Sequence, residues 1–278
     1  MAQVSRLDNV PDAFMRIPDS KPVLVHFYNT KHKVPEGGHL QGVQAFSFNG
    51  KEHLALTGSS GSYSYYVTAP VDSEARLVKL LDSPYRHAGG CQLAGDMLYV
   101  GVEDNVAKDK AKVIALNIDG EIQGTVAERK GRYKRSTAGA TAVIKVNWEI
   151  IAVCDWDSKH IDFYLPTYEG YGLQETYTMP DTGVAGAYQS INLVADTAGH
   201  IFMIGFCKAG STNRADLFSV DANYQLTLLS SRYFKTTNGC SFRYGAGLRV
   251  INKNTLAIYT CQRALKRKNA VNVFTNRF

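Results

Sequence analysis

The amino-acid sequence repeats a group of four short strand-like runs about every fifty residues, and this repeat limits the choice of fold. The runs are rich in Val, Ile, Tyr, Phe and Leu and are separated by Gly, Asn, Asp and Ser, which is typical of strands joined by turns. The first runs of the successive groups begin at residues 39, 87, 137, 188 and 242, at steps of 48, 50, 51 and 54 residues. Four strands per unit at this period are typical of the blades of a β-propeller.

The two ends of the chain supply the strands that a closed ring needs. The fifth group has only three runs, while a lone run at residues 22–28 precedes the first group. An open ring would leave unpaired strand edges, so we expect residues 22–28 to complete the last blade. The sequence therefore predicts one all-β domain over residues 1–278, a five-bladed β-propeller. Its blades are expected at about 39–82, 87–129, 136–180, 186–235, and 238–278 plus 22–28. An open β-sandwich is the alternative, but it does not require a regular repeat.

One segment has helical features. Residues 8–17 contain Asn9, a candidate N-cap, followed by Pro11, and both residue types are common where helices begin. We therefore expect a single short helix before the first strand.

Composition excludes several classes of protein. Hydrophobic residues make up 45% and charged residues 20% of the chain, which is too apolar for a disordered protein. The apolar runs are far shorter than the roughly 20 residues that span a bilayer, and no apolar leader is visible at the N-terminus. The five cysteines form no C-x-x-C pair and mostly lie in or beside apolar runs. We expect free, buried thiols in a cytoplasmic protein without a membrane partner.

The net charge of +6 is mild, and two basic clusters stand out, at residues 129–135 and 266–268. A nucleic-acid interface would gather such charge on one face, with aromatic residues between. The clusters fall between strand-like runs, so the sequence favours solvated loops over a nucleic-acid partner. A protein partner stays open.

A polar residue stands at or next to the start of each first run, and in four of the five runs Gly follows it two or three places later. In a propeller the first strands line the central channel, and small residues let neighbouring blades converge there. We expect the polar side chains to surround one mouth of the channel: His39, His87, Thr137, Tyr188 with Gln189, and Arg243. Because unpaired polar groups are costly to bury, this pattern indicates a small-molecule pocket. A water-filled channel whose polar groups bond one another is the alternative.

The residue types suggest roles in such a pocket. The guanidinium of Arg243 matches the oxygens of a carboxylate or phosphate. His39 and His87 suit acid/base catalysis, or the binding of a divalent metal ion together with Glu103. The remaining ligand-binding candidates are Gln41, Thr137, Tyr188, Gln189 and Trp156. The aromatic members are also compatible with packing between blades.

Acidic residues follow the second runs of two groups. Glu103 and Asp104 end one run, and Asp155 and Asp157 end the next. Antiparallel pairing brings these ends to the mouth where the first runs begin, so we expect Glu103 and Asp155 to approach the histidines as catalytic residues. Two carboxylates can cleave a glycoside, but the same residue types also cap turns.

The function that follows is broad. No H-E-x-x-H, G-x-S-x-G, P-loop or G-x-G-x-x-G motif is present. The sequence predicts a small-molecule-binding propeller that can act on a polar or anionic ligand, as a hydrolase, lyase or isomerase. The alternative is a lectin-like or protein-interaction scaffold without catalysis. Because matching positions differ strongly between units, one site is favoured over five.

Six segments together resemble a group of bacterial five-bladed propeller-type proteins that have no assigned activity. They are HLQG at 39–42, HAGG at 87–90, GVED at 101–104, CDWDS at 154–158, YQSINL at 188–193 and CSFRYGAG at 240–247. The resemblance implies the fold over residues 22–278 and transfers no catalytic residue. The five-blade plan is also similar to that of arabinanase-type glycosidases, tachylectin-like lectins and plant-type glutaminyl cyclases. A likeness of fold assigns no function.

Overall fold

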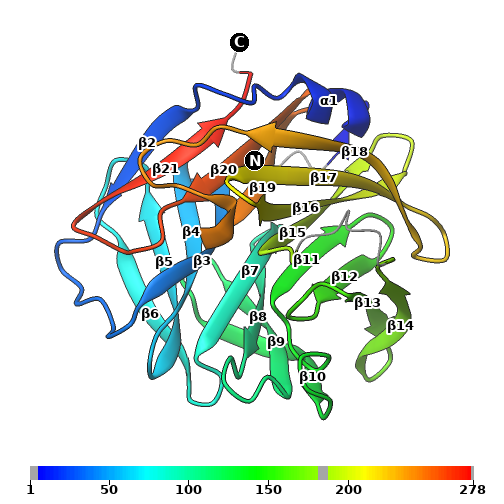
Figure 1. The fold of residues 1–278 in the computed structure, drawn as a ribbon, viewed down its shortest axis with the longest axis horizontal. Helices are drawn as coiled ribbons and strands as arrows, with labels where there is room; N and C mark the ends of the chain where they lie inside the picture. Colours follow the sequence, from blue (N-terminus) through cyan, green and yellow to red (C-terminus); the bar gives the residue numbers. More distant parts are fainter. Residues whose placement is uncertain (1–5, 181–186, 277–278) are drawn as a thin grey trace.

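The structure is a computed structural model that describes residues 6–180 and 187–276 (Figure 1). In this part of the chain nearly all regular structure is β-strand, apart from α1 (Val10–Arg16) and the short 3-10 turn η1 (Phe242–Tyr244). The all-β class that the repeat predicts is therefore present. No helix in the described ranges has the length and apolar character needed to cross a bilayer.

Twenty strands form five antiparallel groups of four, which we call the first to the fifth sheet. The first contains β3 (His39–Phe48), β4 (Lys51–Ser59), β5 (Tyr63–Pro70) and β6 (Arg76–Asp82). The second contains β7 (His87–Ala94), β8 (Met97–Glu103), β9 (Lys110–Asn117) and β10 (Ile122–Lys130). The third contains β11 (Ala140–Lys145), β12 (Glu149–Cys154), β13 (His160–Thr167) and β14 (Gly170–Thr178). The fourth contains β15 (Ser190–Asp196), β16 (Ile201–Ala209), β17 (Thr212–Val220) and β18 (Leu226–Phe234). The fifth contains β19 (Ala246–Asn252), β20 (Thr255–Cys261), β21 (Lys268–Phe274) and β2 (Val23–Tyr28).

Two further pairings connect these groups. A single parallel bridge between Gly90 and Ala140 joins β7 to β11, so the second and third sheets are continuous. The short strand β1 (Arg6–Leu7) adds in parallel to β15.

The N-terminal strand β2 completes the fifth sheet. It pairs antiparallel with β21, with Val25 opposite Val271 and Leu24 opposite Asn272. The pairing expected for residues 22–28 is therefore present, and it joins two segments from opposite parts of the chain.

The first strands of the five sheets lie around the centre of the molecule (Figure 1). Each contacts the first strand of the next sheet, in the order β3, β7, β11, β15 and β19, and β19 contacts β3. Glycine permits the closest of these approaches. A Cβ atom on Gly247 would lie 1.9 Å from the carbonyl oxygen of Val43, and one on Gly89 would lie 2.2 Å from that of Gly139.

Five apolar clusters fill the spaces between neighbouring sheets. Each draws its buried residues from two adjacent sheets, and one of them joins the fifth sheet to the first through residues such as Tyr259 and Val43. Burial of apolar surface between sheets is the main stabilising contribution in such an arrangement. The five cysteines are free and buried, as expected.

The short helix α1 packs on this core. Asn9 caps it, because its Oδ1 accepts a hydrogen bond of 2.9 Å from Asp12 N, and Pro11 lies in the first turn. Val10, Ala13 and Phe14 are buried in the cluster between the fourth and fifth sheets. The predicted helix is confirmed.

Side chains satisfy backbone groups at the inner edges of the first strands. Gln92 on β7 is the main example: its Nε2 donates to Leu193 O at 2.7 Å, and its Oε1 accepts from Val143 N at 3.1 Å and Leu193 N at 2.7 Å. One amide therefore connects the second, third and fourth sheets. Gln44 on β3 likewise donates to Cys91 O, at 3.0 Å.

Three first strands begin later than predicted. The sequence places their starts at residues 137, 188 and 242, whereas β11, β15 and β19 begin at Ala140, Ser190 and Ala246. In the last case Ser241 caps the turn η1 and Gly245 adopts a positive φ of 121° before the strand begins. The predicted start of the fourth blade, at residue 186, and the predicted end of the fifth, at residue 278, lie outside the described residues.

We expect Gln92→Leu to lower the free energy of unfolding by about 2–4 kcal/mol, because two amide N–H groups and one carbonyl would lose their buried partner. Urea denaturation measures this change. Gln123→Leu on the exposed part of β10 is the matched control and should stay within about 0.5 kcal/mol of the wild type. Equal stability of the two variants would contradict the role given to Gln92.

Candidate functional site

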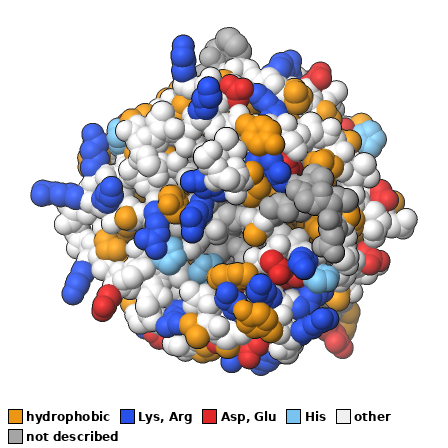
Figure 2. Space-filling view, viewed as in Figure 1, with side chains coloured by type: hydrophobic (Ala, Val, Ile, Leu, Met, Phe, Trp, Pro, Cys, Tyr) orange, Lys and Arg blue, Asp and Glu red, His pale blue; other side chains and the backbone are white. Residues whose placement is uncertain are grey.

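A cavity of about 300 Å³ opens at the end of the axis where the first strands begin. Figure 2 shows the corresponding face, hollowed near its centre, with histidine and basic side chains beside the hollow. The cavity is lined by His39, Gln41, His87, Glu103, Gly139, Trp156, Ala187, Tyr188, Gln189, Arg243, Tyr244 and Arg263. Eight of the ten residues predicted from the sequence are in this set. Thr137 and Asp155 are not.

The close approach of the first strands narrows the axis beside the cavity. A Cβ atom on Gly245 would lie 2.7 Å from Gly42 N, so the backbones of β3 and the segment before β19 are nearly in contact. Gln189 Nε2 donates to Gln41 Oε1 at 2.7 Å and bridges the first and fourth sheets. Both amides belong to the lining, and their hydrogen bond holds two sides of the cavity together.

His87 and Glu103 form a buried pair. They lie opposite each other on β7 and β8, and His87 Nδ1 is 3.1 Å from Glu103 Oε1. Glu103 is fully buried, and its other oxygen, Oε2, accepts a hydrogen bond of 2.7 Å from Ala138 N. In the described part of the chain, neither His87 Nδ1 nor Glu103 Oε1 has a hydrogen bond of regular geometry. The carboxylate is thus fixed through one oxygen, and the other faces the imidazole.

His39 has a different environment. Its Nδ1 lies 3.0 Å from Gly37 O, and because a carbonyl only accepts, Nδ1 carries the proton and Nε2 keeps the lone pair. Burial lowers the pKa of His39 below its ordinary value, and the positive charges of His87 and Arg263 act in the same direction, against the hydrogen bond to Gly37. The rings of His39 and His87 are 6.5 Å apart. His39 is therefore a neutral imidazole near pH 7.

Two arginines stand at the mouth of the cavity. Arg243 belongs to η1, and its backbone N–H donates to Ser241 Oγ at 3.2 Å. Arg263 follows β20, and its carbonyl accepts from Leu40 N at 2.7 Å, which ties it to the strand that carries His39. Among the described residues neither guanidinium has an ion pair or a side-chain hydrogen bond, and both residues are exposed. Both forks are thus available to an anion.

The two aromatic candidates already have partners. Lys108 Nζ lies 4.0 Å from the ring centre of Trp156, and the ring of His87 lies 5.6 Å from it. Tyr188 is 3% exposed, and its hydroxyl donates to Asp216 Oδ2 at 2.7 Å. Both side chains border the cavity, but the Tyr188 hydroxyl is already engaged and Lys108 covers part of the indole.

Asp155 does not line the cavity, and its carboxylate is engaged by His160, a histidine outside the predicted set. Its role as a catalytic residue stays a prediction. Its Oδ2 lies 2.6 Å from His160 Nδ1, and its Oδ1 accepts from His160 N at 3.2 Å. Burial raises the pKa of Asp155 above its ordinary value, although the bonds to His160 oppose the rise. Asp104 caps a turn through Val106 N and Ala107 N. Asp104 and Asp155 both accept hydrogen bonds from backbone N–H groups just after their strands, which is the turn-capping role given above as the alternative to catalysis.

Thr137 lies behind the cavity wall. It is fully buried, its hydroxyl donates to Lys134 O, and the same oxygen accepts from Trp156 N at 2.7 Å. It positions backbone and does not line the cavity. Its contribution is therefore to the wall, through the backbone of Trp156 and Lys134.

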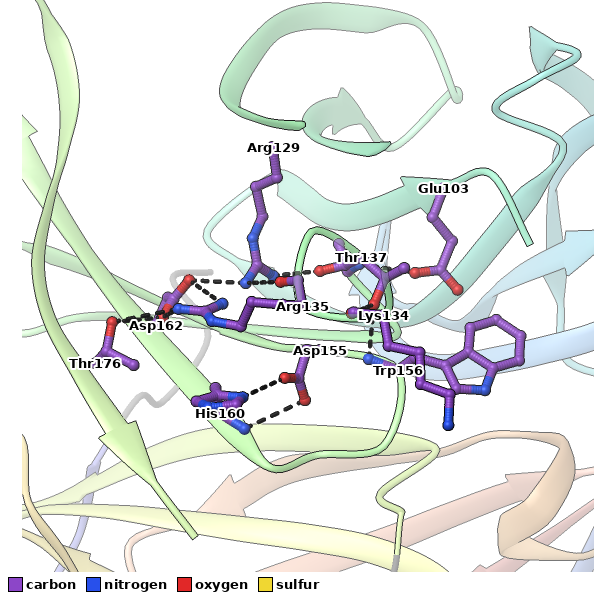
Figure 3. A network of polar contacts seen from close by, with 11 residues as sticks. Glu103, Arg129, Lys134, Arg135, Thr137, Asp155, Trp156, His160, Asp162 and Thr176 are labelled. Atoms are coloured by element: carbon purple, nitrogen blue, oxygen red, sulfur yellow. Dashed lines mark hydrogen bonds and ion pairs between the residues drawn. The ribbon is translucent and has the colours of Figure 1, made fainter. Parts of the chain in front are cut away.

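A buried ion cluster supports this wall (Figure 3). Asp162 receives Arg129 Nη2 at 2.7 Å and two hydrogen bonds from Arg135, at 2.9 and 2.6 Å. Arg129 also donates to the carbonyls of Thr137 and Arg135. The sequence predicts a solvated loop for the basic segment at 129–135. The structure differs, because Arg129 is buried. Although burial alone would raise the pKa of Asp162, the two arginines outweigh it and lower the pKa below its ordinary value.

Arg263 and Tyr244 line the cavity but were not predicted from the sequence. Arg263 follows the second strand of the fifth sheet, the same position that Glu103 has in the second sheet. The rule that identified Glu103 would also have found Arg263, had it been extended from acidic to basic residues. Tyr244 follows Arg243 in a turn that the repeat does not reveal.

The donor set does not fit a metal ion. His39, His87 and Glu103 all line the cavity. Across residues 6–180 and 187–276, no three or more His, Cys, Asp or Glu side chains are grouped so that they could hold one. We assign no step to a metal.

A second cavity of about 660 Å³ lies at the other end of the first strands and is mostly apolar. Its walls include Phe46, Leu93, Ile144 and Leu248. Its only titratable lining residues are Asp96, Lys145 and Arg249, and Arg249 is paired with Glu52 at 3.1 Å. The groups suited to chemistry are therefore concentrated in the first cavity.

Comparisons with solved structures find similar folds at low sequence identity. The catalytic domain of Coprinopsis cinerea GH62 α-L-arabinofuranosidase has a TM-score of 0.60 at 10% identity, covering 94% of this chain and 97% of that chain. The GH43_1 enzyme from Xanthomonas citri complexed with xylose has a TM-score of 0.53 at 9% identity, covering 85% and 87%. CoXyl43, a GH43 β-xylosidase/α-arabinofuranosidase from a compost microbial metagenome, has a TM-score of 0.52 at 10% identity and covers 94% of both chains.

No protein-family model matches the sequence, and no curated protein matches it. The structural matches span most of each chain and support a β-propeller fold. At these identities they show the fold alone.

We expect Arg263→Gln to raise the pKa of His39, because removal of a positive charge stabilises the imidazolium. Histidine resonances followed by NMR through roughly pH 5–8 measure the midpoint, and Arg76→Gln on β6 is the charge-matched control. Since folding lowers the pKa of His39, its protonation disfavours the folded state, and stability falls as pH drops between the unfolded and folded pKa values. An unchanged midpoint would contradict this account.

Asp162→Asn should lower the free energy of unfolding by about 3–5 kcal/mol, because it leaves buried guanidinium charge without its partner. Asp157→Asn is the control, since the 3.7 Å pair of Asp157 with Lys134 is partly exposed and contributes about 0–1 kcal/mol. Denaturant unfolding compares the two variants. The loss of Asp162 stabilisation should also appear in the wild type as pH falls through the lowered pKa of this group.

Proposed function

We propose that this protein is a closed five-bladed β-propeller that binds a small anionic molecule in its axial cavity and acts on it through His39, His87 and Glu103. The observation that carries the proposal is the presence, in one cavity of about 300 Å³, of a buried imidazole–carboxylate pair and two guanidinium groups that have no ion pair within residues 6–180 and 187–276. The lining residues come from all five sheets or from the segments beside them.

Three contacts support the closed ring as one domain. β2 pairs with β21, β19 contacts β3, and an apolar cluster fills the space between the fifth and first sheets. The five sheets would then be the blades, and no edge would be left open within the ring.

The balance of charge favours an anion. Among the described residues, the lining contains Arg243 and Arg263 but a single carboxylate, Glu103, whose free oxygen faces His87. Burying an anion beside two arginines offsets its loss of hydration, because charge-assisted hydrogen bonds are about twice as strong as neutral ones. Gln41, Gln189 and Tyr244 can bond the remaining polar groups of the ligand.

The imidazole–carboxylate pair supports catalysis as well as binding. A carboxylate beside Nδ1 orients a histidine and stabilises the positive charge that develops when Nε2 takes up a proton. His87 is 5% exposed, as expected for a group held in one orientation at a cavity wall.

The similar structures are named as glycoside hydrolases, but the cavity does not favour hydrolysis by paired carboxylates. That reaction uses two acidic groups on opposite sides of the glycosidic bond. Of the lining residues that the structure describes, Glu103 alone is acidic, and Asp155 is occupied by His160. We therefore propose an anionic ligand and acid/base chemistry by histidine. The cytoplasmic location stays a prediction.

Calorimetric titration tests the proposal with two matched pairs of probes, galacturonate with galactose and glucose 6-phosphate with glucose. We expect at least one anion to bind at least tenfold more tightly than its neutral partner. Arg243→Ala and Arg263→Ala should each weaken that binding about 10- to 100-fold, since a bond to a charged group contributes about 1.5–3 kcal/mol. Arg76→Ala should bind normally. Equal affinity for charged and neutral probes would contradict the anion site.

A further inference from the structure

The two histidines of the cavity have opposite surroundings, and this difference suggests a division of roles. His39 donates Nδ1–H to a backbone carbonyl, lies near the positive charges of Arg263 and His87, and presents a lone pair on Nε2. His87 faces the carboxylate of Glu103 at 3.1 Å. A histidine that presents a free lone pair can accept a proton, and a histidine held against a carboxylate can give up a proton while keeping its orientation. By this geometry His39 is the base and His87, paired with Glu103, is the acid.

The separation of the two rings leaves room for a reacting molecule. Their centres are 6.5 Å apart, and both line the same cavity. A base and an acid at this spacing can address two adjacent carbon atoms of one ligand, each within hydrogen-bond reach of a ring nitrogen. The cavity, at about 300 Å³, is at the small end of ligand sites and suits one sugar-sized unit.

The two arginines determine which proton a neutral imidazole can remove. A C–H group next to a carboxylate becomes more acidic when the charge that moves onto the carboxylate oxygens is stabilised by fixed cations. Arg243 and Arg263 are the cations available at this cavity. The reacting carbon is then the one beside the bound carboxylate.

We propose that the cavity catalyses β-elimination from a hydroxylated carboxylic acid of the sugar-acid class, with His39 as base and His87 as acid. His39 Nε2 takes the proton from the carbon next to the carboxylate, and that electron pair forms a double bond to the neighbouring carbon. The C–O bond at the neighbouring carbon breaks, and its oxygen leaves with a proton from His87 Nε2. Proton exchange with water restores both histidines, so no oxidant, reductant or further reactant is consumed. This inference rests on the anion site proposed above.

The roles of the flanking residues follow from this assignment. Arg243 and Arg263 hold the carboxylate and stabilise its additional charge in the transition state. Glu103 is a positioning residue, because it acts through His87 and is itself fully buried and bonded to Ala138 N. Its loss should therefore reduce turnover more than binding.

The test uses the full chain with three acids: trigalacturonate, trimannuronate and gluconate. Calorimetry identifies which of them bind. For those that bind, NMR detects the product and, in D2O, exchange of the proton beside the carboxylate. Ultraviolet absorbance also detects the conjugated double bond that elimination leaves in the two trisaccharides. We expect an elimination product from at least one bound acid, which for gluconate is the 2-oxo acid to which its enol converts. His39→Gln should abolish both product formation and proton exchange. It should leave the dissociation constant of the acid within about threefold of the wild-type value.

Two variants separate this idea from a merely structural role. Glu103→Gln should lower kcat at least tenfold with little change in KM, whereas Asp104→Asn, which alters only a turn cap beside it, should retain kcat. If every acid that binds gives neither product nor proton exchange, or if none of the three binds while another anion tested above does, the elimination is overturned and the anion site stands. If none of the three acids binds, and the anions tested above bind no better than neutral sugars, the anion site itself is wrong.

Discussion

The inner edges of the five first strands create the constraint on which the rest of the structure depends. Each first strand has a neighbour in its own sheet on one side only, so the backbone groups on its other side need partners near the axis. The chain supplies them from adjacent sheets, through Gln92, Gln44 and the single bridge from Gly90 to Ala140. Contacts of this kind require the strands to be nearly touching, which explains the short approaches at Gly89 and Gly247.

The candidate site is a consequence of this tight axis. Where the first strands begin, the chains diverge, and side chains project into the space that opens. The partly or fully exposed residues there, such as His39 and Arg243, avoid the full cost of burial because they face water, whereas Glu103 is fully buried and bonded to Ala138 N. His39, His87 and Arg243 are thus gathered from three different sheets without any local sequence motif. Glu103 joins them because β8 runs antiparallel to β7 and ends where β7 begins.

Most of the architecture could be predicted from the sequence, since strand periodicity and turn residues are local signals. The repeat located four runs per unit, and the need for strand partners correctly paired residues 22–28 with the end of the chain. The same logic brought His39, His87 and Glu103 to one mouth. It could not separate Glu103 from Asp155, because the outcome depends on whether a nearby group captures the carboxylate, and His160 does so for Asp155.

Other differences have the same physical origin. A basic segment at 129–135 looks solvated in the sequence, but Asp162 lies on a strand about 30 residues later and draws Arg129 and Arg135 inward. Ion pairs between residues this far apart leave no periodic pattern in the sequence, so they cannot be predicted from it. Arg263 was missed because the search for polar residues at the ends of second strands was confined to acidic ones. The sequence therefore does not predict which side chains from different strands or sheets bind one another.

The pairing of β2 with β21 has a consequence for the order in which the protein can mature. Arg243 and Arg263 flank strands of the fifth sheet, whose outer member comes from the opposite part of the polypeptide. During synthesis, that sheet cannot assemble until the ribosome has produced residues up to Phe274, so the nascent chain holds His39 and His87 long before it holds the arginines. Proteolytic cleavage between β2 and β3 would free the outer strand to dissociate. The half of the cavity that carries the two arginines is thus the last part to form, and it depends on a strand that a single cleavage can release.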